Sequence, residues 1–225
     1  MGWFLSALVL VCAGGLSAAS SLEAILARSD HTAAAFKGLT ANLKKVSHTA
    51  VIDEDTTDIG TIVVERINPR DVRMLMRIQE PDPKEAAIHD HKAEVYYPKT
   101  QTVQEFDLGS HRDLVDQFLL LGFGSSSKEL RNAYSIEFGG PEAVEGQAAT
   151  RIVLTPISPE MLPHLKKVDL WISDSLGVAV QQKFYEPGGD YIMATYTSIR
   201  VNPSLPESAV KLNLPKGVKR EHPAR

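Results

Sequence analysis

Two stretches of alternating polar and apolar residues, Asp58–Glu80 and Ile88–Leu108, precede the most apolar segment beyond the N-terminal region, Leu114–Phe123. Alternation with a period of two is typical of strands that bury one face. Seven of the ten residues from Leu114 to Phe123 are apolar, whereas a one-sided surface helix needs only about three or four in two turns. We therefore expect a sheet curved around a cavity that holds something apolar, with a short hydrophobic helix as its lid.

The apolar positions of two consecutive strands predict the lining of this cavity. Arg66 follows Ile62 and Val64 on one strand face, and Asn68-Pro69 then turns the chain. The next strand has a wholly apolar face with two methionines, whose flexible thioether chains suit an irregular ligand and ordinary core filling equally well. The predicted lining and lid residues are Ile62, Val64, Val72, Met74, Met76, Ile78, Leu114, Phe118, Leu119, Leu121 and Phe123.

Helical spacing and turn residues complete the expected fold. An apolar stripe with helical spacing runs from Leu22 to Phe36 and stops before Gly38. The lid helix starts at Ser110 with Asp113 and ends at Gly122 and Gly124. Further strands are expected at 39–43, 87–90, 93–97, 134–138, 149–155, 167–172, 178–186 and 191–200, an acidic hairpin loop at 53–58, and a loose basic tail after residue 216. The fold class is mainly β with helices (α+β), a curved antiparallel half-open barrel covered by an N-terminal helix and a short apolar lid helix.

The N-terminal region has the anatomy of a secretory signal. The first 19 residues carry no charged side chain, and the apolar run Trp3–Leu16 is shorter than the roughly 20 residues of a spanning helix. It ends in small residues, which predicts cleavage after Ala18 or Ala19 and a single domain at 20–225. Cys12 is either removed with the signal peptide or lipidated. A lipoprotein signal has Gly, Ala or Ser before its cysteine, whereas this chain has Val11, which favours removal.

Tests for specific chemistry give no site. A net charge of −4 and 7% aromatic residues argue against nucleic acid. His89 and His91 could bind a metal only with a third ligand from His111 or His164, and a solvent-exposed turn explains them as well. The acidic segment 53–58 lacks the glycine and glutamate of a calcium loop. The Gly-x-Ser-x-Gly pattern of serine hydrolases is missing. We expect no enzyme, no metal and no cofactor.

Several short motifs resemble the periplasmic lipoprotein carrier family, the LolA-like proteins, over roughly residues 22–220. The segment 60–66, GTIVVER, is similar to the family strand that ends in an arginine, and 72–74, VRM, to its next strand. The segment 95–98, VYYP, resembles the family's aromatic strand end, and 201–203, 205–206 and 215–218 its C-terminal signature. Asn68, His91 and the pair Val210 and Leu212 depart from the family pattern.

This resemblance implies a fold and a function. The fold is an incomplete antiparallel barrel closed by helices, and Arg66 is the family's latch, which holds the lid on the empty cavity; its alternative is a surface charge at a strand end. The implied function is a monomeric periplasmic carrier that ferries acylated lipoproteins or lipids from an inner-membrane transporter to an outer-membrane acceptor. The alternatives are a LolB-like receptor, a carrier of non-protein lipids and an envelope-stress sensor domain.

Overall fold

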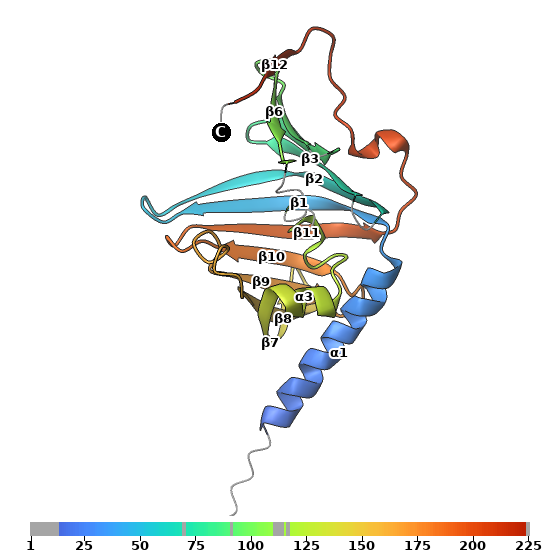
Figure 1. Ribbon diagram of the computed structural model, residues 1–225, viewed down its shortest axis with the longest axis vertical. Helices are drawn as coiled ribbons and strands as arrows, with labels where there is room; N and C mark the ends of the chain where they lie inside the picture. The colour runs from blue at the N-terminus through green and yellow to red at the C-terminus, as the bar shows by residue number, and fades with distance from the viewer. Residues whose placement is uncertain (1–13, 69–70, 91, 110–114, 116–117, 224–225) are drawn as a thin grey trace, which may run out of the picture.

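An open sheet of twelve strands makes up most of the described part of the chain (Figure 1). The computed structural model describes residues 14–68, 71–90, 92–109, 115 and 118–223. The sheet order is β12-β6-β5-β4-β3-β2-β1-β11-β10-β9-β8-β7, and each pair is antiparallel except β12 with β6. The strands are β1 (Gly38–Thr49), β2 (Glu54–Asn68), β3 (Asp71–Glu80), β4 (Lys84–His89), β5 (Lys92–Tyr97), β6 (Thr102–Asp107), β7 (Tyr134–Val144), β8 (Gln147–Pro156), β9 (Lys167–Ser173), β10 (Ala179–Tyr185), β11 (Tyr191–Val201) and β12 (Lys219–Glu221). The sheet does not close, which confirms the predicted half-open barrel of the α+β class.

The hairpin of β1 and β2 forms the middle of the sheet and differs from the expected one at its turn. The turn occupies residues 50–53, and Asp53 has a φ of 51°. The predicted acidic loop at 53–58 is wrong, because Glu54–Asp58 already pairs with Lys45–Thr49 of β1. Cross-strand partners accommodate the acidic side chains: Lys45 forms an ion pair with Asp58, and Nδ1 of His48 lies 2.8 Å from Asp55 Oδ1.

Helices α1 and α3 cover one face of the sheet, here called the inner face. Helix α1 (Gly14–Ala35) buries Leu26 and Ala33 along the predicted stripe, and both α1 and α3 (Ser127–Ala133) pack against β7. Figure 1 shows α3 in front of the β7–β9 side of the sheet, with α1 running along the same side. The seven-residue α3 was not predicted, although Ser126 and Glu129 form a capping box at its start.

Two clusters of buried apolar residues fill the inner side. The first cluster comprises Phe36, Leu39, Ala41, Leu43, Ile62, Val64, Val72, Met74, Ile78, Leu120, Phe123, Val178, Ala179, Ala194 and Tyr196. The second comprises Ile25, Leu26, Leu121, Leu130, Tyr134, Ile152, Leu154, Leu165, Val168, Leu170 and Ile172. The first lies against the middle of the sheet, and the second against β7–β9 and α1.

The C-terminal segment crosses the opposite, outer face. The short helix η2 (Glu207–Val210) contacts β2, β3 and β4, and β12 then adds to the edge of β6 as a parallel strand. Leu75 and Val103, which the strand alternation directs to the outer face, are 1% and 0% exposed. The predicted loose tail is therefore wrong over residues 219–221: these charged residues pair with the backbone of β6, and no apolar period in the sequence predicts that pairing.

Candidate functional site

A row of directly paired residues runs across the inner face from β1 to β6. Its exposure increases toward the sheet edge: Leu39 is 0% exposed, Val64 1%, Met74 9% and Phe106 38%. Directly paired residues share one face of a sheet. The complete row is Leu39, Val64, Met74, Ile88, Ala93 and Phe106. The inner face is therefore a closed core at β1 and β2 and an uncovered surface at β6.

A second row runs beside the first and shows the same trend. Ala41 and Ile62 are buried, whereas Met76 and Val95 are only half-buried. The row consists of Ala41, Ile62, Met76, Ala86, Val95 and Gln104. We use the name apolar wall for the partly uncovered apolar residues of both rows, which are Met76, Ala86, Ile88, Ala93, Val95 and Phe106.

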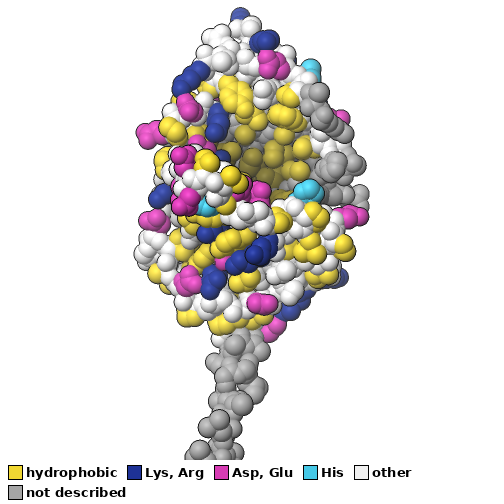
Figure 2. Space-filling view, turned by 90° about the vertical axis from the view of Figure 1, so that its left-hand side faces the viewer, with side chains coloured by type: hydrophobic (Ala, Val, Ile, Leu, Met, Phe, Trp, Pro, Cys, Tyr) yellow, Lys and Arg dark blue, Asp and Glu magenta, His cyan; other side chains and the backbone are white. Residues whose placement is uncertain are grey.

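The surface is hollowed on the half of the molecule that contains the apolar wall. Figure 2 shows hydrophobic side chains gathered in a hollow in the upper half. Figure 1 places β3, β6 and β12 at that same height. Met76 and Ile88 belong to the wall and also pack against the first core cluster. The apolar wall is thus continuous with the buried core.

The segment 118–124 inserts between the two core clusters. Leu120 and Phe123 belong to the first cluster, with Leu119 packed against it. Leu121 belongs to the second, with Phe118 packed against it. The predicted lid residues are therefore divided: Leu119 and Phe123 lie on the predicted lining, but Phe118 and Leu121 do not. Leu114, also predicted for the lid, lies outside the described residues.

Backbone carbonyls fix this segment to the sheet. The Ala179 amide donates to the carbonyl of Gly122 at 2.7 Å, and the Gln182 side-chain amide donates to the carbonyl of Leu121. The Tyr196 hydroxyl in turn donates to Gln182 Oε1 at 2.7 Å, and burial raises the pKa of this phenol, so it stays protonated. Gly122 has a φ of 77°, and an added Cβ would lie 2.7 Å from the Ala179 Cβ. The end of the segment is therefore a firm attachment point.

Arg66 connects this segment to α1. Its Nη2 donates to the carbonyl of Gly124 at 2.5 Å and its Nη1 to the carbonyl of Ala33 at 3.3 Å. The guanidinium lies 5.5 Å from the centre of the Phe36 ring. Burial lowers the pKa of Arg66, against the opposing effect of Glu129. Nε of Arg66 is buried and has no hydrogen-bond partner among the described residues. Arg66 is thus no surface charge, and its position suits the predicted latch, a role that stays a prediction.

The predicted lining residues come together, although their binding role stays a prediction. Ile62, Val64, Val72, Met74 and Ile78 lie in the first cluster, with Met76 packed against it.

Sequence reasoning missed the part of the apolar wall that β4, β5 and β6 contribute. The alternation of side chains at 86–88 and 93–95 indicates that part of the wall. The face that these residues share, however, depends on the register of three hairpins.

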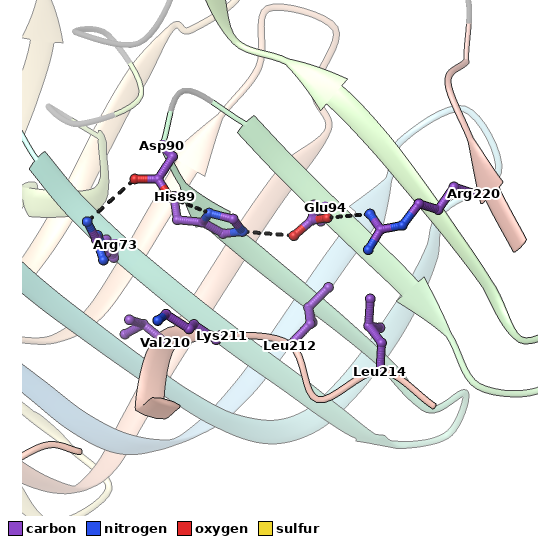
Figure 3. A pocket seen from close by; sticks show the side chains of 9 residues that line it. All are labelled: Arg73, His89, Asp90, Glu94, Val210, Lys211, Leu212, Leu214 and Arg220. Carbon is purple, nitrogen blue, oxygen red and sulfur yellow. Dashed lines mark hydrogen bonds and ion pairs between the residues drawn. The ribbon is translucent and has the colours of Figure 1, made fainter. Parts of the chain in front are cut away.

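The outer face carries a separate pocket of about 210 Å³ (Figure 3). A row of polar contacts lines it. Arg73 contacts Asp90 at 3.4 Å, His89 contacts Asp90 at 3.1 Å and Glu94 at 2.8 Å, and Arg220 contacts Glu94 at 3.1 Å. Its remaining lining is Val210, Lys211, Leu212 and Leu214 from the C-terminal segment. The charges make it unsuited to an acyl chain and suited to holding that segment on the sheet.

His89 is thus occupied by two carboxylates, and His91 lies outside the described residues. Within the described part of the chain, no group of three or more His, Cys, Asp or Glu side chains could hold a metal ion. No helix among the described residues is long and apolar enough to cross a membrane.

Comparison with solved structures finds the same fold at low identity. An uncharacterized conserved protein from Thermus thermophilus matches at a TM-score of 0.55 and 12% identity, over 90% of this chain and 99% of that one. MucB matches at 0.51 and 15% identity, over 88% of this chain; the match spans 64% of MucB. The LolA superfamily protein NE2245 from Nitrosomonas europaea matches at 0.39 and 12% identity, over 84% and 97%. No family model and no curated protein matches the chain.

Proposed function

Because this chain has a LolA-like fold, we propose that it is a periplasmic carrier that binds acyl chains of lipoproteins or related lipids. The observation that carries the proposal is the apolar wall, which remains partly uncovered beside a continuous buried core. Such a surface is what an apolar ligand would cover. The proposed activity is binding and transfer, without a catalysed reaction.

The energetics of acyl chains explain why a carrier is needed. Burial of each methylene contributes about 0.8 kcal/mol, so an acyl chain exposed to water costs on the order of 10 kcal/mol. Half-buried Met76, Ile88 and Val95 would gain this contact when a chain lies on them. Exposed Phe106, at 38%, would cover its outer end.

Release requires that the empty protein regains part of that energy. A ligand shifts a conformational equilibrium only by its differential affinity for the two states. In our proposal, cargo displaces the side chains of the segment 118–124 that pack on the first core cluster, while Leu121 and Gly122 stay bonded to the sheet. The contacts of Arg66 with Gly124 and Ala33 re-form after release. The donor would be an inner-membrane transporter and the acceptor an outer-membrane component, and the protein would act as a monomer.

Val95→Glu tests the wall directly. The substitution places a carboxylate on the half-buried inner face, where burial of an unpaired charge disfavours an adjacent alkyl chain. We expect the purified variant to lose most of its binding of a fluorescent fatty acid such as cis-parinaric acid. Wild-type protein should also carry lipid or acylated peptide detectable by mass spectrometry.

Ile59→Glu is the matched control, because Ile59 is 39% exposed and alternates onto the outer face of β2. Circular dichroism would establish that both variants fold. Absence of probe binding by the wild type, or equal binding by Val95→Glu and Ile59→Glu, would rule out the wall as the acyl site.

A further inference from the structure

Two lysines share one carboxylate oxygen on the inner face. Lys45 of β1 is the direct cross-strand partner of Asp58 of β2, and its Nζ lies 2.8 Å from Asp58 Oδ2. Nζ of Lys84, from β4, lies 3.4 Å from the same oxygen. The side chains are 23%, 13% and 30% exposed for Lys45, Asp58 and Lys84. An ammonium group has three donors, so each lysine keeps donors that Asp58 does not use.

Among the described residues, this lysine pair carries one more positive charge than its carboxylate partner balances. Two ammonium groups face one carboxylate, which leaves one unit of charge. Burial raises the pKa of Asp58, but the hydrogen bond and charge of Lys45 and the charge of Lys84 outweigh it and hold the pKa below its ordinary value. Asp82 also interacts electrostatically with Lys84, but its carboxylate is itself paired with Lys99 at 2.5 Å. The carboxylate is thus fully ionised at neutral pH, and the surplus charge is positive.

The lysine pair borders the apolar wall. Lys84 pairs directly with buried Ile78, and the next inner-face positions along β4 are Ala86 and Ile88 of the wall. Arg66 lies eight residues from Asp58 along β2, which corresponds to about 27 Å of strand. The pair and Arg66 therefore occupy opposite ends of the inner face.

The hollow opens toward the end of the sheet that carries the lysines. The β1–β2 turn projects to the left in Figure 1, and Figure 2 views the molecule from that side, with the hollow facing the viewer. Lys45 and Asp58 lie five residues or fewer from that turn, at 50–53. A ligand whose tail enters the hollow would leave its head group near these lysines.

We propose that the ligand is an amphiphile with a negatively charged head group, a phosphate diester or a carboxylate, which Lys45 and Lys84 bind while its acyl chain lies on the apolar wall. This inference rests on the proposed function and names the cargo class that the carrier accepts. Lysine suits such an anion because its ammonium group acts as a compact charge with rotatable donors.

Displacement of cis-parinaric acid by unlabelled amphiphiles tests the proposal. The displacers share one palmitoyl chain and differ in the head group: palmitoyl lysophosphatidylglycerol and palmitate are anionic, and monopalmitoylglycerol is neutral. We expect wild-type protein to bind at least one anionic displacer about tenfold more tightly than the neutral one, since hydrogen bonds to charged groups contribute roughly that much. The two anionic displacers distinguish a phosphate site from a carboxylate site. High salt should reduce the preference.

The variants separate a head-group role from a structural one. The triple variant K45Q/D58N/K84Q removes all three charges together and leaves no unpaired carboxylate; it should lose the anion preference and retain affinity for monopalmitoylglycerol. Asp58→Asn alone should strengthen anion binding, because both lysines gain free donors. Lys44→Gln is the matched control, since Lys44 is exposed on the outer face beside Lys45.

Each outcome bears on a different proposal. Equal affinity of wild-type protein for anionic and neutral amphiphiles overturns the head-group site but leaves the carrier intact, as does an anion preference that persists in K45Q/D58N/K84Q. An Asp58→Asn variant with no gain for either anion also counts against the site. If wild-type protein binds none of the amphiphiles, the carrier and the head-group site both fail.

Discussion

Nη2 of Arg66 donates a hydrogen bond to the carbonyl oxygen of Gly124, 2.5 Å away, and so joins strand β2 to the end of the segment 118–124. The same guanidinium reaches the carbonyl of Ala33 in α1. One side chain therefore holds together three elements that are far apart in the sequence. These contacts depend on the position of the segment 118–124. In our proposal they are present in the empty carrier and absent in the loaded one.

Arg66→Leu should slow the release of bound acyl cargo. The variant cannot regain the hydrogen bonds to Gly124 and Ala33 on closing, and a hydrogen bond to a charged group contributes about 1.5–3 kcal/mol. We expect roughly tenfold slower transfer of a fluorescent acyl probe to lipid vesicles, with binding retained. Arg200→Leu, at an exposed position of β11, is the control. A transfer rate of Arg66→Leu equal to that of the control would remove the latch role.

Gly124→Ala should disturb the same contact from its other side. An added Cβ would lie 2.5 Å from Arg66 Nη2 and 2.8 Å from a ring carbon of Phe36, so the guanidinium must move. Overpacking of this kind costs about 1–3 kcal/mol. Hydrogen exchange should show weaker protection of the 118–124 backbone amides. Gly188→Ala meets no atom within 4 Å and should change nothing; equal protection in both variants would contradict the expected clash.

The local sequence pattern predicted the strands well, because the alternation of apolar and polar side chains is visible within a short run of residues such as Val72 to Ile78. The inner-face position of Ile62, Val64 and Met74 followed from it. The extent of the apolar wall did not, because the faces of Ala86 and Val95 depend on pairing between strands. Lys45 continues the alternation of Leu39, Ala41 and Leu43, yet its partner Asp58 is fixed only by the turn at 50–53.

The divided placement of the lid residues has a similar cause. Phe118, Leu121 and Phe123 are all apolar, and composition alone cannot assign them to different clusters. The assignment depends on the carbonyls of Leu121 and Gly122, which bind Gln182 and Ala179 more than fifty residues later in the chain. Such contacts are set by the assembled sheet and leave no periodic signal.

Asn202→Ala should destabilise the fold. Asn202 Oδ1 accepts from the backbone amides of Lys37 at 2.7 Å and Gly38 at 3.3 Å, and its Nδ2 donates to the carbonyl of Ala35 at 2.8 Å. Its φ of 54° lies in the left-handed region, which asparagine tolerates better than alanine. We expect a loss of about 2–3 kcal/mol in the free energy of unfolding, measured in urea.

Asn202→Asp is the matched variant, because it keeps the acceptor for Lys37 and Gly38 but loses the donor to Ala35. It should fall between wild type and Asn202→Ala. If Asn202→Ala unfolds at the wild-type urea concentration, the junction of α1 and β1 does not depend on this side chain.

The pH dependence of stability should report the lysine pair. Because the pKa of Asp58 in the folded state is below its ordinary value of 3.8, its pairing with Lys45 and Lys84 stabilises the fold above that value and is lost as pH falls through the lower, folded-state pKa. At neutral pH, Asp58→Asn should lower the free energy of unfolding by about 1–2 kcal/mol, between the values for exposed and buried pairs. The difference from wild type should shrink below about pH 4.

Urea unfolding at several pH values measures this difference. Asp82→Asn is the control, because its carboxylate is exposed and its loss should have little effect on stability at neutral pH. A constant difference between wild type and Asp58→Asn down to the lowest pH at which both fold would show that the carboxylate charge does not act through the two lysines.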